Sequence, residues 1–148
     1  MDRRRAYLDS SVLLRSLLRQ PDVLPGLSQW ALVASELLEV DARRTLHRLC
    51  AIRALSEPDL ALRSAELHTF LAAVDQVPIS KIILNRAGGP LGGALGTRNA
   101  IHLVTAMLWS ESNGESIVFL THDRQLANAA RACGLTVYPD STRHAAGL

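Results

Sequence analysis

Residues 117–138 read IVFLTHDRQLANAARACGLTVY, and this stretch decides the fold that the sequence predicts. Residues 117–120 are a continuous apolar run, which is typical of a strand buried on both faces. A helix is expected over residues 124–132, closed by Gly134 as its C-terminal cap, and residues 135–138 read as another strand. A strand, a helix and a strand in this order predict a parallel sheet that helices cover on both faces.

The same alternation of strands and helices runs through the rest of the chain. Short strands are expected at residues 6–8, 30–33 and 77–79, although the second could instead lead into the following helix. Helices are expected at residues 10–18, 35–55, 56–74, 80–86 and 98–109, the last with Thr97 as its N-cap. Residues 88–96 contain five glycines and predict a loop. We therefore predict an α/β fold with three layers, in which a small central parallel sheet is flanked by helices.

The composition fits one compact domain spanning residues 1–148, with a loosely held tail after about residue 139. Hydrophobic residues make up 48% of the chain, yet no apolar run reaches the roughly 18 residues of a membrane helix. Asp9 and Arg15 interrupt the apolar stretch that a signal peptide would need, so we expect a cytoplasmic protein with no membrane contact. Cys50 and Cys133 are too few for a disulfide framework or a zinc site.

Arginine supplies 15 of the 16 basic residues in a chain whose net charge is +2. Because guanidinium groups bind phosphates through two hydrogen bonds and stack on bases, this bias suits a nucleic-acid partner. A genome rich in GC codons would produce the same bias without any binding to nucleic acid.

Two aspartates follow predicted strands. Asp9 comes directly after residues 6–8, and Asp123 lies three residues after Leu120. In an open parallel sheet, ligands bind beyond the carboxyl ends of the strands, so both side chains reach the same edge if their strands are neighbours. Aspartate also commonly caps the helix that follows it, and the two roles can coexist.

Further polar residues lie on helical faces that otherwise point to the core. At about 100° per residue, Asp41 flanks the apolar stripe of the 35–55 helix, where a carboxylate needs a partner such as a metal ion or an arginine. Asn99 lies beside Leu103 in the first turn of the 98–109 helix. The alternatives are a buried ion pair for Asp41 and local backbone hydrogen bonds for Asn99. His102, three residues after Asn99, is expected to be a packed, hydrogen-bonded residue, with an approach to the site as the alternative.

Carboxylates that converge in one place repel one another unless a cation neutralises them. Ligation by oxygen alone, without histidine or cysteine partners, points to Mg²⁺ or Mn²⁺ rather than to zinc. Such sites typically cleave phosphodiesters, because the metal ions activate a water and stabilise the attacking and leaving oxygens. The candidates for this chemistry are Asp9, Asp41, Asn99 and Asp123.

Four segments, in order, resemble the motifs of the PIN-domain family, and within it the VapC-type toxins of bacterial toxin–antitoxin pairs. They are YLDSS at residues 7–11, ASELLEVDARR at residues 34–44, TRNAIHL at residues 97–103, and FLTHDRQL at residues 119–126 followed by GLTV at residues 134–137. The second motif usually carries a glutamate where this chain has Asp41, and the third an aspartate where it has Asn99. The resemblance covers nearly the whole chain.

The resemblance implies a PIN-like α/β/α fold, a homodimer, and an endoribonuclease that depends on Mg²⁺ or Mn²⁺. It also implies that RNA is the substrate and that a VapB-type antitoxin blocks the site. It makes Asp9, Asn99 and Asp123 the metal ligands, with Asp41 binding a second metal or positioning water. Ser10 and Thr121 are expected to hydrogen-bond the site or the phosphate.

Asn99 is the main departure from the family pattern. It keeps an oxygen that can ligate, but it lowers the formal charge of the four candidates from −4 to −3, which predicts an inactivated or weakened site. Two origins are open: a substitution introduced so that a toxic nuclease could be produced, or a natural residue of a slow or non-catalytic member.

Two functions other than a nuclease are alternatives for this sequence. Asn99 favours a degenerate PIN-like module that binds RNA or a partner without cutting. A phospho-acceptor receiver domain would need paired acids after the first strand and a lysine near the end of the chain. The single lysine is Lys81, so the receiver is set aside.

Overall fold

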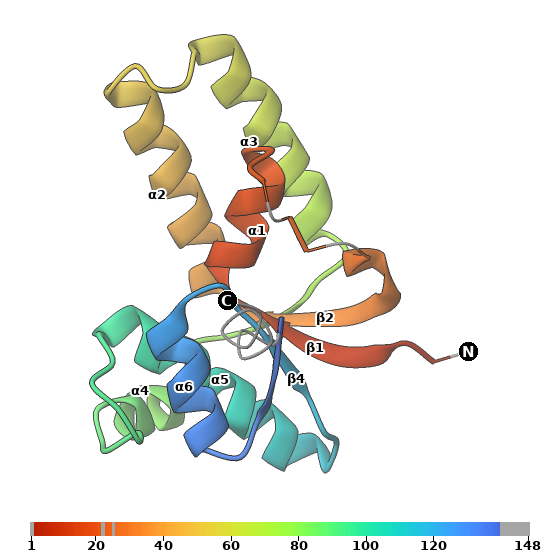
Figure 1. Cartoon of the computed structure of the whole chain (residues 1–148), viewed down its shortest axis with the longest axis vertical. Helices are drawn as coiled ribbons and strands as arrows, with labels where there is room; N and C mark the ends of the chain where they lie inside the picture. The colour runs from red at the N-terminus through yellow and green to blue at the C-terminus, as the bar shows by residue number, and fades with distance from the viewer. Residues whose placement is uncertain (1, 22, 25, 140–148) are drawn as a thin grey trace, which may run out of the picture.

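The computed structural model describes residues 2–21, 23–24 and 26–139, so the predicted tail after about residue 139 lies outside the described residues. Within them, five parallel strands form one sheet in the order β3–β2–β1–β4–β5 (Figure 1). The strands are β1 Arg4–Leu8, β2 Trp30–Ser35, β3 Asp75–Val77, β4 Val118–Leu120 and β5 Thr136–Tyr138. The helices are α1 Ser10–Leu17, the 3-10 turn η1 Leu27–Gln29, α2 Leu37–Ala51, α3 Glu57–Leu71, α4 Lys81–Ala87, α5 Thr97–Asn113 and α6 Arg124–Ala132.

Alternating side chains of the central strands divide the core into two halves. Tyr7 of β1 and Phe119 of β4 face one side, whereas Ala6 and Leu8 face the other, and all four are fully buried. Helices α1, α2 and α3 cover the side of Leu8, and α4, α5 and α6 cover the side of Tyr7 (Figure 1). The predicted α/β fold, a small parallel sheet flanked by helices, is confirmed.

Some predicted boundaries are wrong by a few residues. Strand β3 ends at Val77 rather than covering residues 77–79, because Pro78 has no N–H to donate to the sheet. Helix α2 ends at Ala51 rather than near residue 55. Residues 30–33, which the sequence left open between a strand and a lead-in, belong to β2.

Helix α5 departs most from its predicted bounds. Thr97 is its first residue and not its N-cap, which is Gly96 in an extended conformation. The helix continues past Trp109 to Asn113, whose Nδ2 donates to the Trp109 carbonyl oxygen at 2.8 Å. It ends at Gly114, which adopts the left-handed conformation with φ of 60°. Neither α5 nor any other helix in the described part of the chain is long and apolar enough to cross a membrane.

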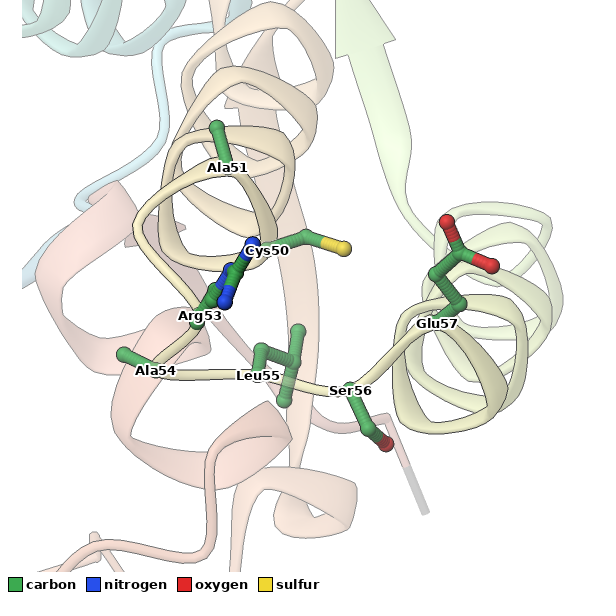
Figure 2. A pocket seen from close by; sticks show the side chains of 7 residues that line it. All are labelled: Cys50, Ala51, Arg53, Ala54, Leu55, Ser56 and Glu57. Carbon is green, nitrogen blue, oxygen red and sulfur yellow. The ribbon is translucent and has the colours of Figure 1, made fainter.

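The turn between α2 and α3 borders an open hollow of about 400 Å³. Figure 2 shows the side chains that line it, which belong to Cys50, Ala51 and residues 53–57. Cys50 is a free thiol that lies nine residues after Asp41 on α2, which is about 14 Å along the helix axis at 1.5 Å per residue. The hollow is therefore remote from the strand ends where the candidate site lies.

We predict that Phe119→Ala lowers the free energy of unfolding by about 3–5 kcal/mol, because it empties a fully buried position. The ring it removes stacks on Tyr7 with 5.2 Å between the centroids. Leu62→Ala, at a position on α3 that is 49% exposed, should cost about 0.5 kcal/mol. Urea unfolding followed by circular dichroism measures both variants, and equal losses would contradict the assignment of Phe119 to the core.

Candidate active site

The pairing of β1 with β4 brings two of the predicted aspartates to one edge of the sheet. Leu8 pairs with Leu120, and the Asp9 backbone N–H donates to the Leu120 carbonyl oxygen at 3.1 Å. Asp9 is the N-cap of α1 and Asp123 is the N-cap of α6. Both carboxylates therefore lie at the positive ends of helices, beyond the carboxyl ends of neighbouring strands. The capping role and the convergence coexist.

The Asp9 carboxylate is buried and accepts hydrogen bonds from two hydroxyl groups. Ser11 Oγ donates to Asp9 Oδ2 at 2.7 Å, and Thr121 Oγ1 donates to the same oxygen at 2.8 Å. Ser10, a predicted site residue, donates its backbone N–H to Asp9 Oδ1 at 2.8 Å, while its hydroxyl oxygen is 3.5 Å from the same atom. The sequence pattern did not single out Ser11, because the orientation of two adjacent serines depends on the exact start of the helix.

Thr121 and Asn99 connect Asp123 to this cluster. Thr121 Oγ1 accepts the backbone N–H of Asp123 at 3.0 Å while it donates to Asp9. Asn99 Nδ2, in the first turn of α5, donates to Asp123 Oδ2 at 3.2 Å. Asn99 is thus a neutral hydrogen-bond donor at a position where an aspartate would place another negative charge beside Asp123.

Asp41 joins the same region through His102 of α5. His102 Nε2 is 3.0 Å from Asp41 Oδ2 and 4.0 Å from Asp9 Oδ1, so the imidazole approaches both carboxylates. Arg98 Nε lies 3.9 Å from the same Asp41 oxygen. The Asp41 side chain is only 11% exposed, in agreement with the inward-facing flank that the helical pattern predicted. Among the described residues, the polar side chain nearest to the Asp41 carboxylate is that of His102.

A continuous chain of contacts therefore links the four candidate residues. It runs from Asp41 through His102, Asp9, Thr121 and Asp123 to Asn99. In the part of the chain that the structure describes, no three His, Cys, Asp or Glu side chains are grouped so as to hold a metal ion. The available donors are carboxylate, amide and hydroxyl oxygens, which are the ligands of Mg²⁺ and Mn²⁺. The donor chemistry fits such a cation, provided that the Asn99 amide turns its oxygen toward it.

Tyr7 lies behind His102 and was not predicted as part of the site. Its hydroxyl oxygen is 2.7 Å from His102 Nδ1 and accepts the Ser35 backbone N–H at 3.2 Å. Burial raises the pKa of the Tyr7 phenol well above its usual range, although the hydrogen bond from Ser35 opposes this effect. The one indication in the sequence was the polar hydroxyl group of a tyrosine on a predicted buried strand, two residues before Asp9.

Comparison with known proteins shows similarity in sequence to a ribonuclease and in fold to a solved structure. The chain is 30% identical over 135 residues to Ribonuclease VapC46 from Mycobacterium tuberculosis (strain ATCC 25618 / H37Rv), which covers 91% of this chain and 97% of that protein. The crystal structure of PAE2754 from Pyrobaculum aerophilum matches over the whole of both chains, with a TM-score of 0.59 and 18% sequence identity. At this identity the second match shows the fold alone. No protein-family model matches the chain.

We predict that the Tyr7 phenol stays protonated near pH 10, where an exposed tyrosine ionises. Since its folded pKa lies above the unfolded one, its contribution to stability is present below about pH 10 and is lost as the pH rises toward the folded pKa. Ultraviolet absorbance titration of Tyr138→Phe, which removes the more exposed of the two tyrosines, measures Tyr7 alone. A phenolate that forms near pH 10 in this variant while it remains folded would contradict the burial of Tyr7.

Proposed function

The chain belongs to the VapC-type PIN-domain family, and on this basis we propose that it is a metal-dependent endoribonuclease. We propose further that it is the toxin of a type II toxin–antitoxin pair and that its cofactor is Mg²⁺ or Mn²⁺. The observation that carries this proposal is the convergence of four polar side chains from separate parts of the chain at one edge of the sheet. They are Asp9, Asp41, Asn99 and Asp123.

Asp9, Asn99 and Asp123 would hold the cation. When bound, the cation supplies an activated water nucleophile and stabilises the charge that develops on the phosphate. Thr121 fixes the Asp9 carboxylate through its hydroxyl, and Ser10 does so through its backbone N–H. These contacts remove the freedom of the carboxylate to turn away from the cation.

Asp41 would bind a second cation or orient the attacking water. It lies beside the cluster, with His102 between it and Asp9. His102 Nε2 is 3.0 Å from Asp41 Oδ2 and 4.0 Å from Asp9 Oδ1. A carboxylate in this place adds negative charge that favours cation binding and can accept a proton from water.

The proposed partners are RNA, a VapB-type antitoxin and a second copy of the chain. Two exposed arginines border the site and would bind phosphates of the RNA backbone. Arg98 lies 3.9 Å from Asp41, and Arg124 directly follows Asp123 at the start of α6. The antitoxin would cover this region and keep RNA out. We propose that residues 1–148 act as a single domain in these interactions.

A second candidate function is that of a degenerate module that binds RNA or a protein partner without cutting. The observation that favours it is the Asn99 amide, whose Nδ2 donates to Asp123 Oδ2 at 3.2 Å. This hydrogen bond satisfies a carboxylate oxygen without any cation and removes one of the charges that would attract one.

We predict that Asn99→Asp creates or strengthens metal-dependent RNA cleavage. A fourth carboxylate beside Asp123 repels it in the absence of metal and attracts a divalent cation, so Mn²⁺ affinity should rise by about tenfold or more. For the same reason the melting temperature should fall without metal and recover when Mn²⁺ is added. The measurements are cleavage of RNA with Mg²⁺ or Mn²⁺, calorimetric titration with Mn²⁺, and thermal unfolding.

Asn85→Asp is the matched control, because it makes the same chemical change at an exposed position on α4. It should alter neither Mn²⁺ binding nor cleavage, and EDTA should stop any cleavage that is observed. If neither this chain nor Asn99→Asp binds Mn²⁺ or cuts RNA, the nuclease proposal is contradicted. Retained RNA binding in that case would support the non-cutting module.

A further inference from the structure

A buried chain of polar groups leads from the sheet to Asp41. The Ser35 N–H, at the end of β2, donates to Tyr7 Oη at 3.2 Å, and Tyr7 Oη is 2.7 Å from His102 Nδ1. His102 Nε2 is in turn 3.0 Å from Asp41 Oδ2. Ser35, Tyr7 and His102 are fully buried, so water does not compete for these hydrogen bonds.

In the series of hydrogen bonds from Ser35 to Asp41, each donor lies on the Ser35 side of its acceptor. A carboxylate only accepts, so a neutral imidazole carries its hydrogen on Nε2 and keeps a lone pair on Nδ1. The Tyr7 oxygen already accepts the Ser35 N–H, and its own hydrogen points to that lone pair. The neighbouring Thr105 hydroxyl donates elsewhere, to the Ile101 carbonyl oxygen at 2.6 Å.

We propose that His102 is a positioning residue for the proposed metal-dependent cleavage, and that Tyr7 reinforces the tautomer with which His102 holds Asp41. The inference rests on the function proposed above. Nε2–H holds Asp41 Oδ2, while Asp41 Oδ1 accepts no hydrogen bond from the described residues. An aspartate on the flank of a helix can otherwise turn about its side-chain bonds, so fixing one oxygen prepares the other for a cation or a water.

The place of the imidazole distinguishes this role from ordinary packing. Its Nε2 approaches Asp9 Oδ1 to 4.0 Å as well as Asp41, so one donor group lies between carboxylates from two different segments. An apolar side chain of similar volume would fill the same space without the cost of burying an imidazole. It would also leave the two carboxylates with no donor between them.

The tautomer of His102 tests the first part of the inference without any metal or RNA. Long-range proton–nitrogen correlation spectra of the imidazoles report which ring nitrogen carries the hydrogen, and His102→Gln identifies the signals of His102 by their loss. We expect hydrogen on Nε2 alone in the unaltered protein and a smaller share of this tautomer in Tyr7→Phe, which lacks the hydroxyl. Hydrogen on Nδ1, whether alone or together with hydrogen on Nε2, would overturn the inference.

Mn²⁺ binding tests the second part, in this chain and in Asn99→Asp. His102→Leu should weaken Mn²⁺ binding roughly tenfold or more, as loss of a ligand's supporting hydrogen bond usually does. His102→Gln can place an amide N–H near the position of Nε2 and should recover most of that loss, which a role in packing alone would not predict. His68→Leu, which alters an exposed histidine on α3, is the control and should leave the affinity unchanged.

The outcomes separate this inference from the function on which it rests. If His102→Leu keeps its circular dichroism spectrum and binds Mn²⁺ as tightly as its parent, the positioning role is wrong while the proposed metal site stands. If neither parent binds Mn²⁺, the proposed function itself fails, and the positioning role fails with it. If His102→Leu does not fold, His102→Gln decides, since it should then fold and bind Mn²⁺ nearly as its parent does.

Discussion

The candidate site depends on the parallel pairing of β1 with β4. The two strands are separated by more than 100 residues of sequence, yet Leu8 and Leu120 are partners in the sheet and the Asp9 N–H donates to the Leu120 carbonyl oxygen. This pairing places the N-termini of α1 and α6 side by side, and with them Asp9 and Asp123. Helices from opposite faces of the sheet then add Asp41 and Asn99. A different strand order would separate the carboxylates and leave no site.

Carboxylates that lie this close together repel one another, so they need hydrogen-bond donors between them. Thr121 connects the Asp9 carboxylate to the Asp123 backbone, and His102 lies between Asp9 and Asp41. Asn99 donates to Asp123 in a place where an aspartate would repel it. Hydrogen-bond donors of the protein thus stabilise the cluster. Asn99 fits this arrangement because it is such a donor, and for the same reason it favours binding without RNA cleavage.

Much of this was predictable from the sequence, for identifiable reasons. Strand β4 and helix α6 were predicted to within one residue, because an apolar run and a helix end are local signals. The C-cap of α6 is Cys133, however, and the predicted cap Gly134 follows it in the left-handed conformation. The helical faces of Asp41 and Asn99 followed from periodicity. The Tyr7–His102 contact did not, because it joins residues 95 positions apart and depends on how α5 packs on the sheet. The end of β3 was also predicted wrongly, because the residues around Pro78 are apolar but the proline has no N–H to donate to the sheet.

The most direct test of the account is crystallographic. Crystals of this chain and of Asn99→Asp would be soaked in Mn²⁺, and the anomalous scattering of manganese would locate the ion. We predict a peak in Asn99→Asp within about 2.0–2.6 Å of carboxylate oxygens of Asp9 and Asp123, and a weaker peak at the same place in this chain. No peak there in either crystal, or a peak bound elsewhere, would contradict a metal site at the ends of β1 and β4.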